Sequence, residues 1–388
     1  MNKLTTAALA TIVLVFAFAK VSNATIRRCG YWGTPTALDY SSLQNAYNAS
    51  VAGDTLMVYP NNSGWGIQTV THKVVILGNG RSWDAFSDYG SIIDTVNKNM
   101  QTLYGHSNVA TIYFGAGSDS SVVSGLVFNT GACYIGAINY YTPVAGVKSV
   151  NGIKVERCLF FNNNGIYLEG NNNGCKIIGN YFVYGSINCN YTGNNYATSN
   201  LTVSNNIFRP AGTSIIIKQY GLGLTGVLKN NIFRDPLFQS TYAGEIIIPT
   251  GAMMIENNIS NGLTTLNAPN CLFHNNIGTG TEWPTNANYG SGNLQNIPYS
   301  SLFVNSFNNS PTLSPEARFV LKAGSPAIGY YYGGASSGSS DAGIFGGPTP
   351  HAINGTPAAP IIYKVSGPSN QQSNGGTLQL TISAKTLN

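Results

Sequence analysis

Charged residues are scarce in this chain of 388 residues. They make up only 9% of the sequence, with a net charge of +5, whereas they form about 25% of a typical soluble domain. The few lysines and arginines are scattered, so the chain lacks the basic cluster that nucleic-acid binding requires. After Ala24 no apolar run is long enough to cross a bilayer, which excludes a membrane-spanning helix from the expected mature chain.

Metal-binding patterns are also missing. The four histidines lie far apart, and no pair has metal-ligand spacing. The six cysteines match no CxxC or zinc pattern; they are Cys29, Cys133, Cys158, Cys175, Cys189 and Cys271. We therefore expect no metal site and no cofactor. Two alternatives remain for the cysteines: disulfides, which an oxidising compartment permits, or isolated small apolar side chains inside the fold.

Residues 1–24 have the pattern of a secretory signal peptide. Lys3 gives a small positive region, and residues 7–19 form an uncharged apolar run. Small residues at Ser22 and Ala24 then predict cleavage before Thr25. The alternative is an N-terminal membrane anchor, for which the run is short. We expect a secreted protein, either extracellular or at the cell surface.

Asparagine is abundant and recurs at one place in a repeat. Each repeat has a short β-rich run, then the asparagine, then a large apolar residue. A period of roughly 20 to 30 residues with one strand motif per period predicts a solenoid. Stacked coils bring equivalent residues to about 4.8 Å from one another, so each asparagine can accept from one neighbour and donate to the next. The predicted ladder is Asn180, Asn206, Asn231, Asn258 and Asn276.

The residues after each ladder position predict two more columns, both expected inside the coils. The first is aromatic and comprises Phe128, Phe160, Phe182, Phe208 and Phe233. The second is mainly aliphatic and comprises Val127, Leu159, Tyr181, Ile207, Ile232, Ile259 and Ile277. In the two earliest coils the asparagine place is taken by Leu126 and Cys158, so the ladder is expected to begin at Asn180.

A short amphipathic helix over residues 41–50, followed by strands at 55–59 and 73–77, predicts an N-terminal cap for the solenoid. We assign residues 25–347 to the solenoid. Near its end, residues 330–340 are expected to form a flexible loop that residues 341–347 close.

The C-terminal residues are expected to form a separate unit. Residues 348–360 form a proline-rich linker, and residues 361–388 contain two strands, at 361–365 and 377–385. The predicted apolar face of the second strand comprises Leu378, Leu380, Ile382 and Ala384. A lone hairpin is marginally stable, so three roles are open: a cap on the last coil, a strand donated to a neighbouring subunit in a head-to-tail polymer, or a secretion or anchoring signal.

The chain resembles the bacterial right-handed parallel β-helix proteins of the pectin-lyase-like superfamily. The resemblance covers residues 41–347 and is carried by the Gly53-Asp54 opening, the Asn-Asn-Ile-Phe repeats, and Gly324-Ser-Pro-Ala-Ile328 followed by Asp341-Ala-Gly-Ile-Phe345. It implies an all-β fold, a right-handed parallel β-helix. This fold hosts lyases, hydrolases, adhesins and surface proteins, so it does not fix the function.

The catalytic motifs of the superfamily's enzymes are not found. Polygalacturonase-like hydrolases need paired carboxylates, and the nearest strings, at 105–107, 129–131 and 216–218, lack the residues that do the chemistry. A lyase needs clustered acidic calcium ligands beside a basic residue. Glu156 and Glu256 share one repeat position but are separated by several coils, so they are expected to lie too far apart to act together. Glu169 or Glu245 could approach Lys218 in three dimensions.

We therefore predict no catalytic residue and favour a non-catalytic structural or adhesive protein that self-associates or contacts surface glycans. A carbohydrate-active enzyme and a glycan-binding module are the alternatives. His274 is expected to be exposed on the surface. The run of tyrosines at 330–332 is expected either to stack on sugar rings or to pack against the end of the solenoid.

Overall fold

A computed structural model describes most of the predicted solenoid. The described residues are 24–30, 37–66, 68–80, 107–139, 142–143, 149–161, 165–183, 185–190, 196–208, 215–220, 222–233, 245–261, 265–281, 283–284, 289–304, 319–332, 341–351, 360–366 and 381–386. The predicted signal peptide, apart from Ala24, lies outside them, as do most of the linker and the loop residues 333–340.

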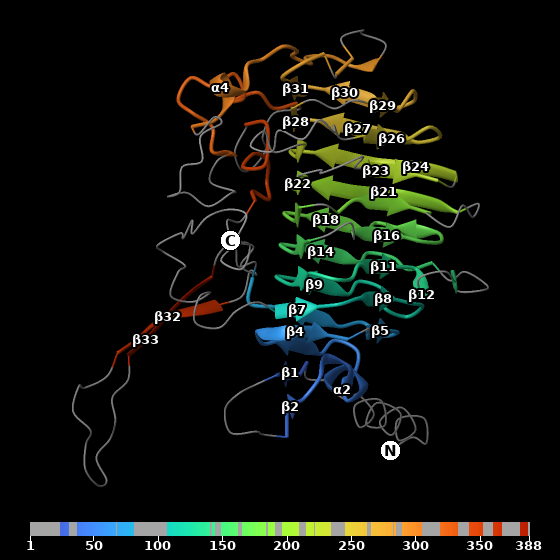
Figure 1. The fold of residues 1–388 in the computed structure, drawn as a ribbon, viewed down its shortest axis with the longest axis vertical. Helices are drawn as coiled ribbons and strands as arrows, with labels where there is room; N and C mark the ends of the chain where they lie inside the picture. Colours follow the sequence, from blue (N-terminus) through green and yellow to red (C-terminus); the bar gives the residue numbers. More distant parts are fainter. Residues whose placement is uncertain are drawn as a thin grey trace, which may run out of the picture.

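Successive coils of the chain stack into three long parallel sheets (Figure 1). Sheet 1 contains β1 (Ile26–Cys29), β2 (Asp39–Tyr40), β3 (Thr55–Val58), β6 (Val75–Leu77), β9 (Val122–Ser124), β14 (Lys154–Glu156), β17 (Asn172–Asn173), β18 (Lys176–Ile178), β21 (Ala197–Ser204), β24 (Leu222–Lys229), β27 (Ala252–Glu256) and β30 (Leu272–His274). Sheet 2 contains β4 (Asn61–Trp65), β7 (Ser107–Val109), β10 (Val127–Phe128), β15 (Leu159–Phe160), β19 (Tyr181–Phe182), β22 (Ile207–Phe208), β25 (Ile232–Phe233), β28 (Ile259–Ser260) and β31 (Ile277–Gly278). Sheet 3 contains β5 (Gln68–Val70), β8 (Ile112–Phe114), β11 (Cys133–Ile135), β16 (Ile166–Leu168), β20 (Ile187–Cys189), β23 (Ile215–Gln219), β26 (Glu245–Ile247) and β29 (Thr265–Asn267).

The predicted fold class is confirmed: the chain is an all-β parallel β-helix with a short N-terminal helix and C-terminal strands. A small antiparallel pair, β12 (Ala137–Asn139) and β13 (Thr142–Pro143), projects from one coil. Among the described residues, no helix has the length and apolar content needed to cross a membrane.

Helix α2 (Leu43–Asn48) covers the N-terminal end of the stack (Figure 1). The Ser42 hydroxyl accepts a hydrogen bond from the Asn45 N–H at 3.1 Å and so caps the first turn. Leu43, Ala46 and Tyr47 are buried against the first strands. The helix covers sheet ends that would otherwise be free to pair with another chain.

The aromatic column lies inside the coils, as the repeat predicts. Its rings stack in parallel at 4.7 Å for Phe128–Phe160, 4.8 Å for Phe160–Phe182, 4.7 Å for Phe182–Phe208 and 5.4 Å for Phe208–Phe233. All five side chains are at most 1% exposed. The ring spacing matches the strand spacing, so register in sheet 2 fixes the stack.

The aliphatic column does not lie inside the coils, and that prediction was wrong. Successive side chains of a strand point to opposite faces, so Leu159 must point outward from the solenoid where Phe160 points inward. The outward residues are nevertheless buried, because the C-terminal segment packs over them. This second core combines the column with Tyr299, Leu302, Phe303, Phe319, Ala327, Ala342 and Ile344, of which the first two belong to helix α4 (Tyr299–Leu302).

The chain then returns along the outside of the coils. We call residues 341–351 the strap.

The strap meets the residue that precedes each of three ladder asparagines. This residue has a positive φ, at 56° in Asn205, 54° in Asn230 and 57° in Asn257, a conformation that asparagine tolerates better than most residues. The Asn205 amide donates 2.8 Å hydrogen bonds to the Ile344 and Gly346 carbonyls.

The strap continues the same pattern from coil to coil. The Asn230 amide donates to the Asp341 and Gly343 carbonyls at 3.3 Å, and the Gly343 N–H donates to the Asn257 carbonyl at 2.9 Å. At the far end, His351 Nδ1 lies 2.7 Å from the Asn205 carbonyl. In the pairs at 205–206, 230–231 and 257–258 the first asparagine therefore holds the strap, while the second forms the ladder.

The two C-terminal strands, β32 (Pro360–Ser366) and β33 (Thr381–Thr386), form an antiparallel hairpin. Within the part of the chain that the structure describes, they pair with each other and with no strand of the three sheets. The strap has already carried the chain back from the coil of Asn257 to the coil of Asn205 before these strands begin. Ile382 and Ala384 lie in β33, whereas Leu378 and Leu380 lie outside the described residues.

Candidate functional site

The asparagine ladder is a continuous hydrogen-bonded column. Asn180 Oδ1 accepts from the Cys158 N–H at 2.9 Å. Asn206 Oδ1 accepts from both the backbone N–H of Asn180, at 2.8 Å, and its side-chain amide, at 3.1 Å. The same pair of bonds recurs at Asn231, Asn258 and Asn276. Each side-chain amide also donates to a strand carbonyl of the preceding coil, as Asn206 does to Ile177 at 2.9 Å.

The column extends one residue beyond the prediction. Asn293 Oδ1 accepts from the Asn276 N–H at 3.1 Å and from its side-chain amide at 3.0 Å. The sequence before Asn293 is glycine-rich and lacks a β-rich run. However, the spacing from Asn276 to Asn293 is close to the spacing from Asn258 to Asn276, and this signal could have revealed Asn293. All five predicted asparagines are 0% exposed, so the ladder holds coils together and cannot reach a ligand.

The carboxylates of the described residues are dispersed. Glu156 and Glu256 occupy the same position of sheet 1, four strand spacings apart, which is about 19 Å at about 4.8 Å per strand. Paired glycosidase carboxylates lie about 5–10 Å apart. Glu156 instead forms an ion pair with Lys154 at 2.6 Å on its own strand.

Lys218 is separated from Glu169 by an intervening strand, and the backbone of Glu245 is out of register with it. Lys218 lies in β23 beside Asn188 and Ile247, and its ammonium sits 4.5 Å from the centre of the Tyr220 ring. Glu169 follows β16, two strands away in sheet 3, and is 3% exposed. The backbone of Glu245 is in register with Ile215 and Thr265, not with Lys218.

Three tyrosines form an outward-facing column on sheet 3. Tyr113, Tyr134 and Tyr167 stack at 4.8 Å in each step, with interplanar angles of 19° and 15°. They are 6%, 4% and 8% exposed. Because sugar binding by stacking uses an open ring face, and these faces cover one another, the column does not present an open sugar platform.

His274 is not an exposed surface residue, so that prediction was wrong. It is 9% exposed, and its ring stacks on Tyr332 with centroids 3.9 Å apart. Tyr332 also donates its backbone N–H to Asn257 Oδ1 at 2.7 Å, and the Tyr330 hydroxyl donates to the Gly292 carbonyl. These tyrosines thus pack against the solenoid, which is one of the two alternatives.

The same region contains a buried acid. Glu256 lies between Lys229 and His274 in register and is 7% exposed. Burial raises its pKa, against the opposing charge of Lys229. Burial also raises the pKa of Tyr331, and the charge of Glu256 adds to the effect. The C-terminal segment therefore covers this acid and closes it off from a polymeric substrate.

A pocket of about 200 Å³ lies at the C-terminal end of sheet 3. Its lining residues are Leu266, Asn267, Ala268, Pro269, Phe273, Pro284 and Tyr289. None of these is a carboxylate, histidine, cysteine or basic residue, so the lining lacks the paired carboxylates that glycoside hydrolysis uses. Tyr289 is its one side chain with an ionisable hydroxyl.

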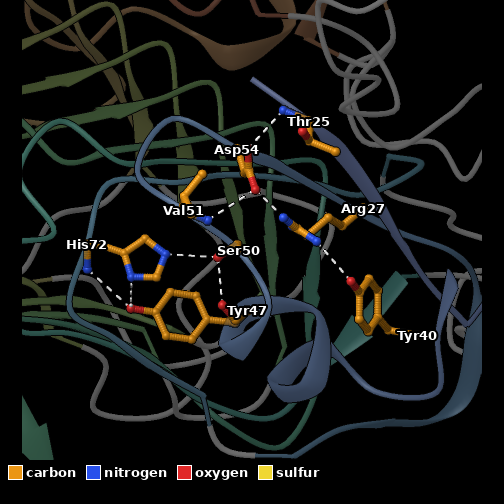
Figure 2. A network of polar contacts seen from close by, with 8 residues as sticks. All are labelled: Thr25, Arg27, Tyr40, Tyr47, Ser50, Val51, Asp54 and His72. Carbon is orange, nitrogen blue, oxygen red and sulfur yellow. Dashed lines mark hydrogen bonds and ion pairs between the residues drawn. The ribbon is translucent and has the colours of Figure 1, made fainter. Parts of the chain in front are cut away.

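A polar network beside α2 contains a serine and a histidine in contact (Figure 2). Ser50 Oγ lies 2.8 Å from His72 Nε2, and the Tyr47 hydroxyl lies 2.8 Å from His72 Nδ1. Nucleophilic catalysis would require the serine to donate its proton to an unprotonated imidazole nitrogen.

The direction of each proton argues against an activated serine. The Tyr47 oxygen accepts from the backbone N–H groups of Thr71 and His72, at 2.6 and 3.1 Å. Its own proton has two acceptors within reach, His72 Nδ1 at 2.8 Å and Thr71 Oγ1 at 3.1 Å, and the shorter contact assigns it to Nδ1. The remaining ring proton is then on Nε2, as a donor to Ser50. The Ser50 proton goes to the Tyr47 carbonyl at 2.6 Å. The network joins α2 to the end of β5 rather than activating a nucleophile.

The state of His72 should make stability depend on pH. Burial lowers its pKa below 6.5, although the charge of Asp54 acts in the opposite direction. The unfolded chain therefore binds the proton more readily than the folded chain. The contribution of neutral His72 to the free energy of unfolding is fully present above about pH 6.5, and it is lost as the pH falls from there through the lowered pKa. We expect the melting temperature to fall more between about pH 7.5 and pH 5 in the native chain than in a His72→Gln variant.

The His72→Gln comparison also provides its own control, because all other titrating groups are present in both proteins. An equal pH dependence of the two melting temperatures, measured by circular dichroism, would contradict the role of His72.

The cysteines are free and buried at all six positions, which selects the apolar alternative. Burial raises the pKa of Cys29 to about 12 and that of Cys175 to about 11. The thiolate is the reactive form. We expect no thiol of the folded protein to react with a chromogenic thiol reagent at about pH 7.5 within minutes, and all six to react in denaturant. Fewer than six thiols after denaturation would show that disulfides form.

A scan against protein-family models finds no match for this chain, and a search of curated proteins finds no related protein.

Proposed function

We propose that this protein is a non-catalytic structural or adhesive β-helix of the extracellular space or cell surface, of the pectin-lyase-like type. The observation that carries the proposal is the continuous ladder from Cys158 to Asn293, whose five predicted asparagines are sealed at 0% exposure. A stack of coils held by neighbour contacts gives a rigid rod whose length follows coil number. Dispersed carboxylates and a closed Glu256 support a role without catalysis.

The C-terminal hairpin is the proposed means of self-association. A two-stranded hairpin is marginally stable alone and has edges that can pair with another chain. The strap ends at His351, at the flank of the coil of Asn205. The hairpin therefore joins a neighbouring rod from the flank, whereas donation from the last coil would have given a strictly head-to-tail contact.

The test compares the full secreted chain with a version that ends at His351. This truncation keeps the strap and removes everything that follows it. We expect oligomers or filaments of the full chain by light scattering and negative-stain microscopy, and a folded monomer of the truncated chain. A second variant, with Ile382 and Ala384 replaced by lysine, should behave like the truncation. Identical monomers in all three cases would contradict self-association.

The enzyme and glycan-binding alternatives are tested on pectins, alginates and neutral glycans, with and without calcium. We expect neither cleavage nor saturable binding. Cleavage that disappears in Glu169→Gln or Glu256→Gln would overturn the non-catalytic proposal, whereas saturable binding without cleavage would indicate a glycan-binding module.

A further inference from the structure

The first strand is held at Thr25 by a buried carboxylate (Figure 2). The Thr25 N–H donates to Asp54 Oδ1 at 2.8 Å, and the Thr25 carbonyl accepts from the Thr55 N–H at 2.9 Å. Asp54 is 0% exposed, whereas Ala24 is exposed. The backbone is therefore fixed from the nitrogen atom of Thr25 onward.

This nitrogen is also the atom that the sequence pattern predicts as the mature N-terminus. We propose that the Ala24–Thr25 peptide bond is the processing site of this chain and that Asp54 is a binding site for the resulting α-ammonium group. A signal-peptidase-type hydrolase adds water across the bond. Ala24 leaves as a carboxylate, and the Thr25 nitrogen becomes an amine that takes a proton.

The surroundings of Asp54 suit a cation at this point. Burial by itself raises the pKa of Asp54, but hydrogen bonds from the Thr25 and Val51 N–H groups and from Arg27 outweigh it and hold the pKa below its usual range. Asp54 Oδ2 binds Arg27 Nε at 2.8 Å and the Val51 N–H at 3.1 Å. Asp54 Oδ1 points to Thr25 and accepts its hydrogen bond from the Thr25 N–H.

The other titratable groups around the carboxylate are Arg27 of β1, Tyr40 of β2, and His72 after β5. The Tyr40 hydroxyl accepts from Arg27 Nη1 at 2.8 Å, and His72 is neutral at pH 7 because its pKa is lowered. Asp54 is thus the negative group that this network directs toward Thr25. Processing replaces a neutral amide donor by a charged one at the same place, and charge-assisted hydrogen bonds are stronger.

Processing would therefore stabilise the first coil. The pKa of the α-ammonium should rise above the usual value of about 7.7–8.0. A group whose pKa is raised by folding stabilises the folded state below its unfolded pKa, and this contribution is lost as the pH rises through the folded pKa.

The experiment has two parts. Mass spectrometry of the secreted protein should show Thr25 as the first residue. Acylation of the folded protein at about pH 8 is then quantified by peptide mapping at Thr25, with the exposed Lys73 as an internal reference. At about pH 8 an α-amine with the usual pKa of about 7.7–8.0 is about half free, so a pKa rise of one unit lowers the free-amine fraction about fivefold and each further unit lowers it about tenfold. We therefore expect Thr25 to react at least about fivefold more slowly than in a short peptide of the same N-terminal sequence.

Two variants separate this binding from simple burial. A chain that begins at Ala24 displaces the amine by one residue, so its α-amine should react as fast as the peptide and the protein should melt at a lower temperature. Asp54→Asn should restore the reactivity of Thr25. If Asp54→Asn does not fold, the Ala24 chain decides alone. A different mature N-terminus, or equal reactivity and melting of the Thr25 and Ala24 chains, would overturn the proposal.

Discussion

Replacement of Asn231 by alanine is expected to lower the free energy of unfolding by about 2–5 kcal/mol. Asn231 Oδ1 is the acceptor for the backbone N–H of Asn206, at 2.9 Å, and for its side-chain amide, at 3.0 Å. The side-chain amide of Asn206 keeps its bond to the Ile177 carbonyl, but the buried N–H loses its acceptor. An orphaned buried donor costs about 1–3 kcal/mol, and each further lost bond adds to this.

The further lost bonds come from the amide of Asn231 itself. It donates to the Val203 and Lys229 carbonyls, at 3.0 and 2.9 Å, and to Asn258 Oδ1 at 3.0 Å. Asn258 Oδ1 retains the backbone N–H of Asn231 as a donor. The damage therefore spreads to both neighbouring coils, which is expected where stability arises between neighbours.

Urea unfolding followed by circular dichroism measures the loss, and hydrogen exchange should show faster exchange at the Asn206 amide. The matched control is Asn48→Ala. Asn48 is exposed and accepts from the Gln44 side chain at 2.8 Å, so its removal should change stability by at most about 0.5 kcal/mol. Similar losses for the two variants would contradict the importance of the ladder.

Replacement of Phe182 by alanine is expected to lower the free energy of unfolding by about 4–8 kcal/mol. Phe182 is 0% exposed at the centre of the aromatic column. Truncation of a buried phenylalanine costs about 3–5 kcal/mol, because apolar contacts are lost and a cavity remains. Phe182 also stacks on Phe160 at 4.8 Å and on Phe208 at 4.7 Å, and aromatic pairs add about 0.5–1.5 kcal/mol each.

Phe233→Ala is the matched comparison within the same column. Phe233 has one parallel neighbour, Phe208 at 5.4 Å, while its contact with Trp283 is tilted by 52° at 6.2 Å. We expect a smaller loss than at Phe182, measured by the same urea titration. A larger loss at Phe233 would show that the cavity, rather than the stack, decides the effect.

The sequence predicts the ladder well because its signal is local and periodic. The asparagine at each turn, and the aromatic residue two positions later, recur with the period of one coil, and the structure brings them into columns. Asn293 was missed because no β-rich run precedes it. His274 was placed on the surface because its position faces outward, and its cover, Tyr332, comes from a segment much further along the chain.

The Asn-Asn pairs that meet the strap, at 205–206, 230–231 and 257–258, show the same division. Their sequence is identical from coil to coil, yet Asn205 has a left-handed backbone and binds the strap, while Asn206 binds its neighbours in the ladder. Sequence spacing identifies the pair as a turn. It does not say that the first amide will meet carbonyls of the distant strap, because a return of the chain leaves no period in the sequence.

The sequence by itself determined the solenoid, its aromatic core and its asparagine ladder, because stacking at a fixed strand spacing forces equivalent residues into contact. The tertiary structure decided which outward faces are open. The aliphatic column, Glu256 and His274 point away from the coils and would be accessible on a bare solenoid. The returning C-terminal segment buries them. Its packing is favourable because it removes the apolar surface of sheet 2 from water, and it leaves the C-terminal hairpin at the flank of the rod.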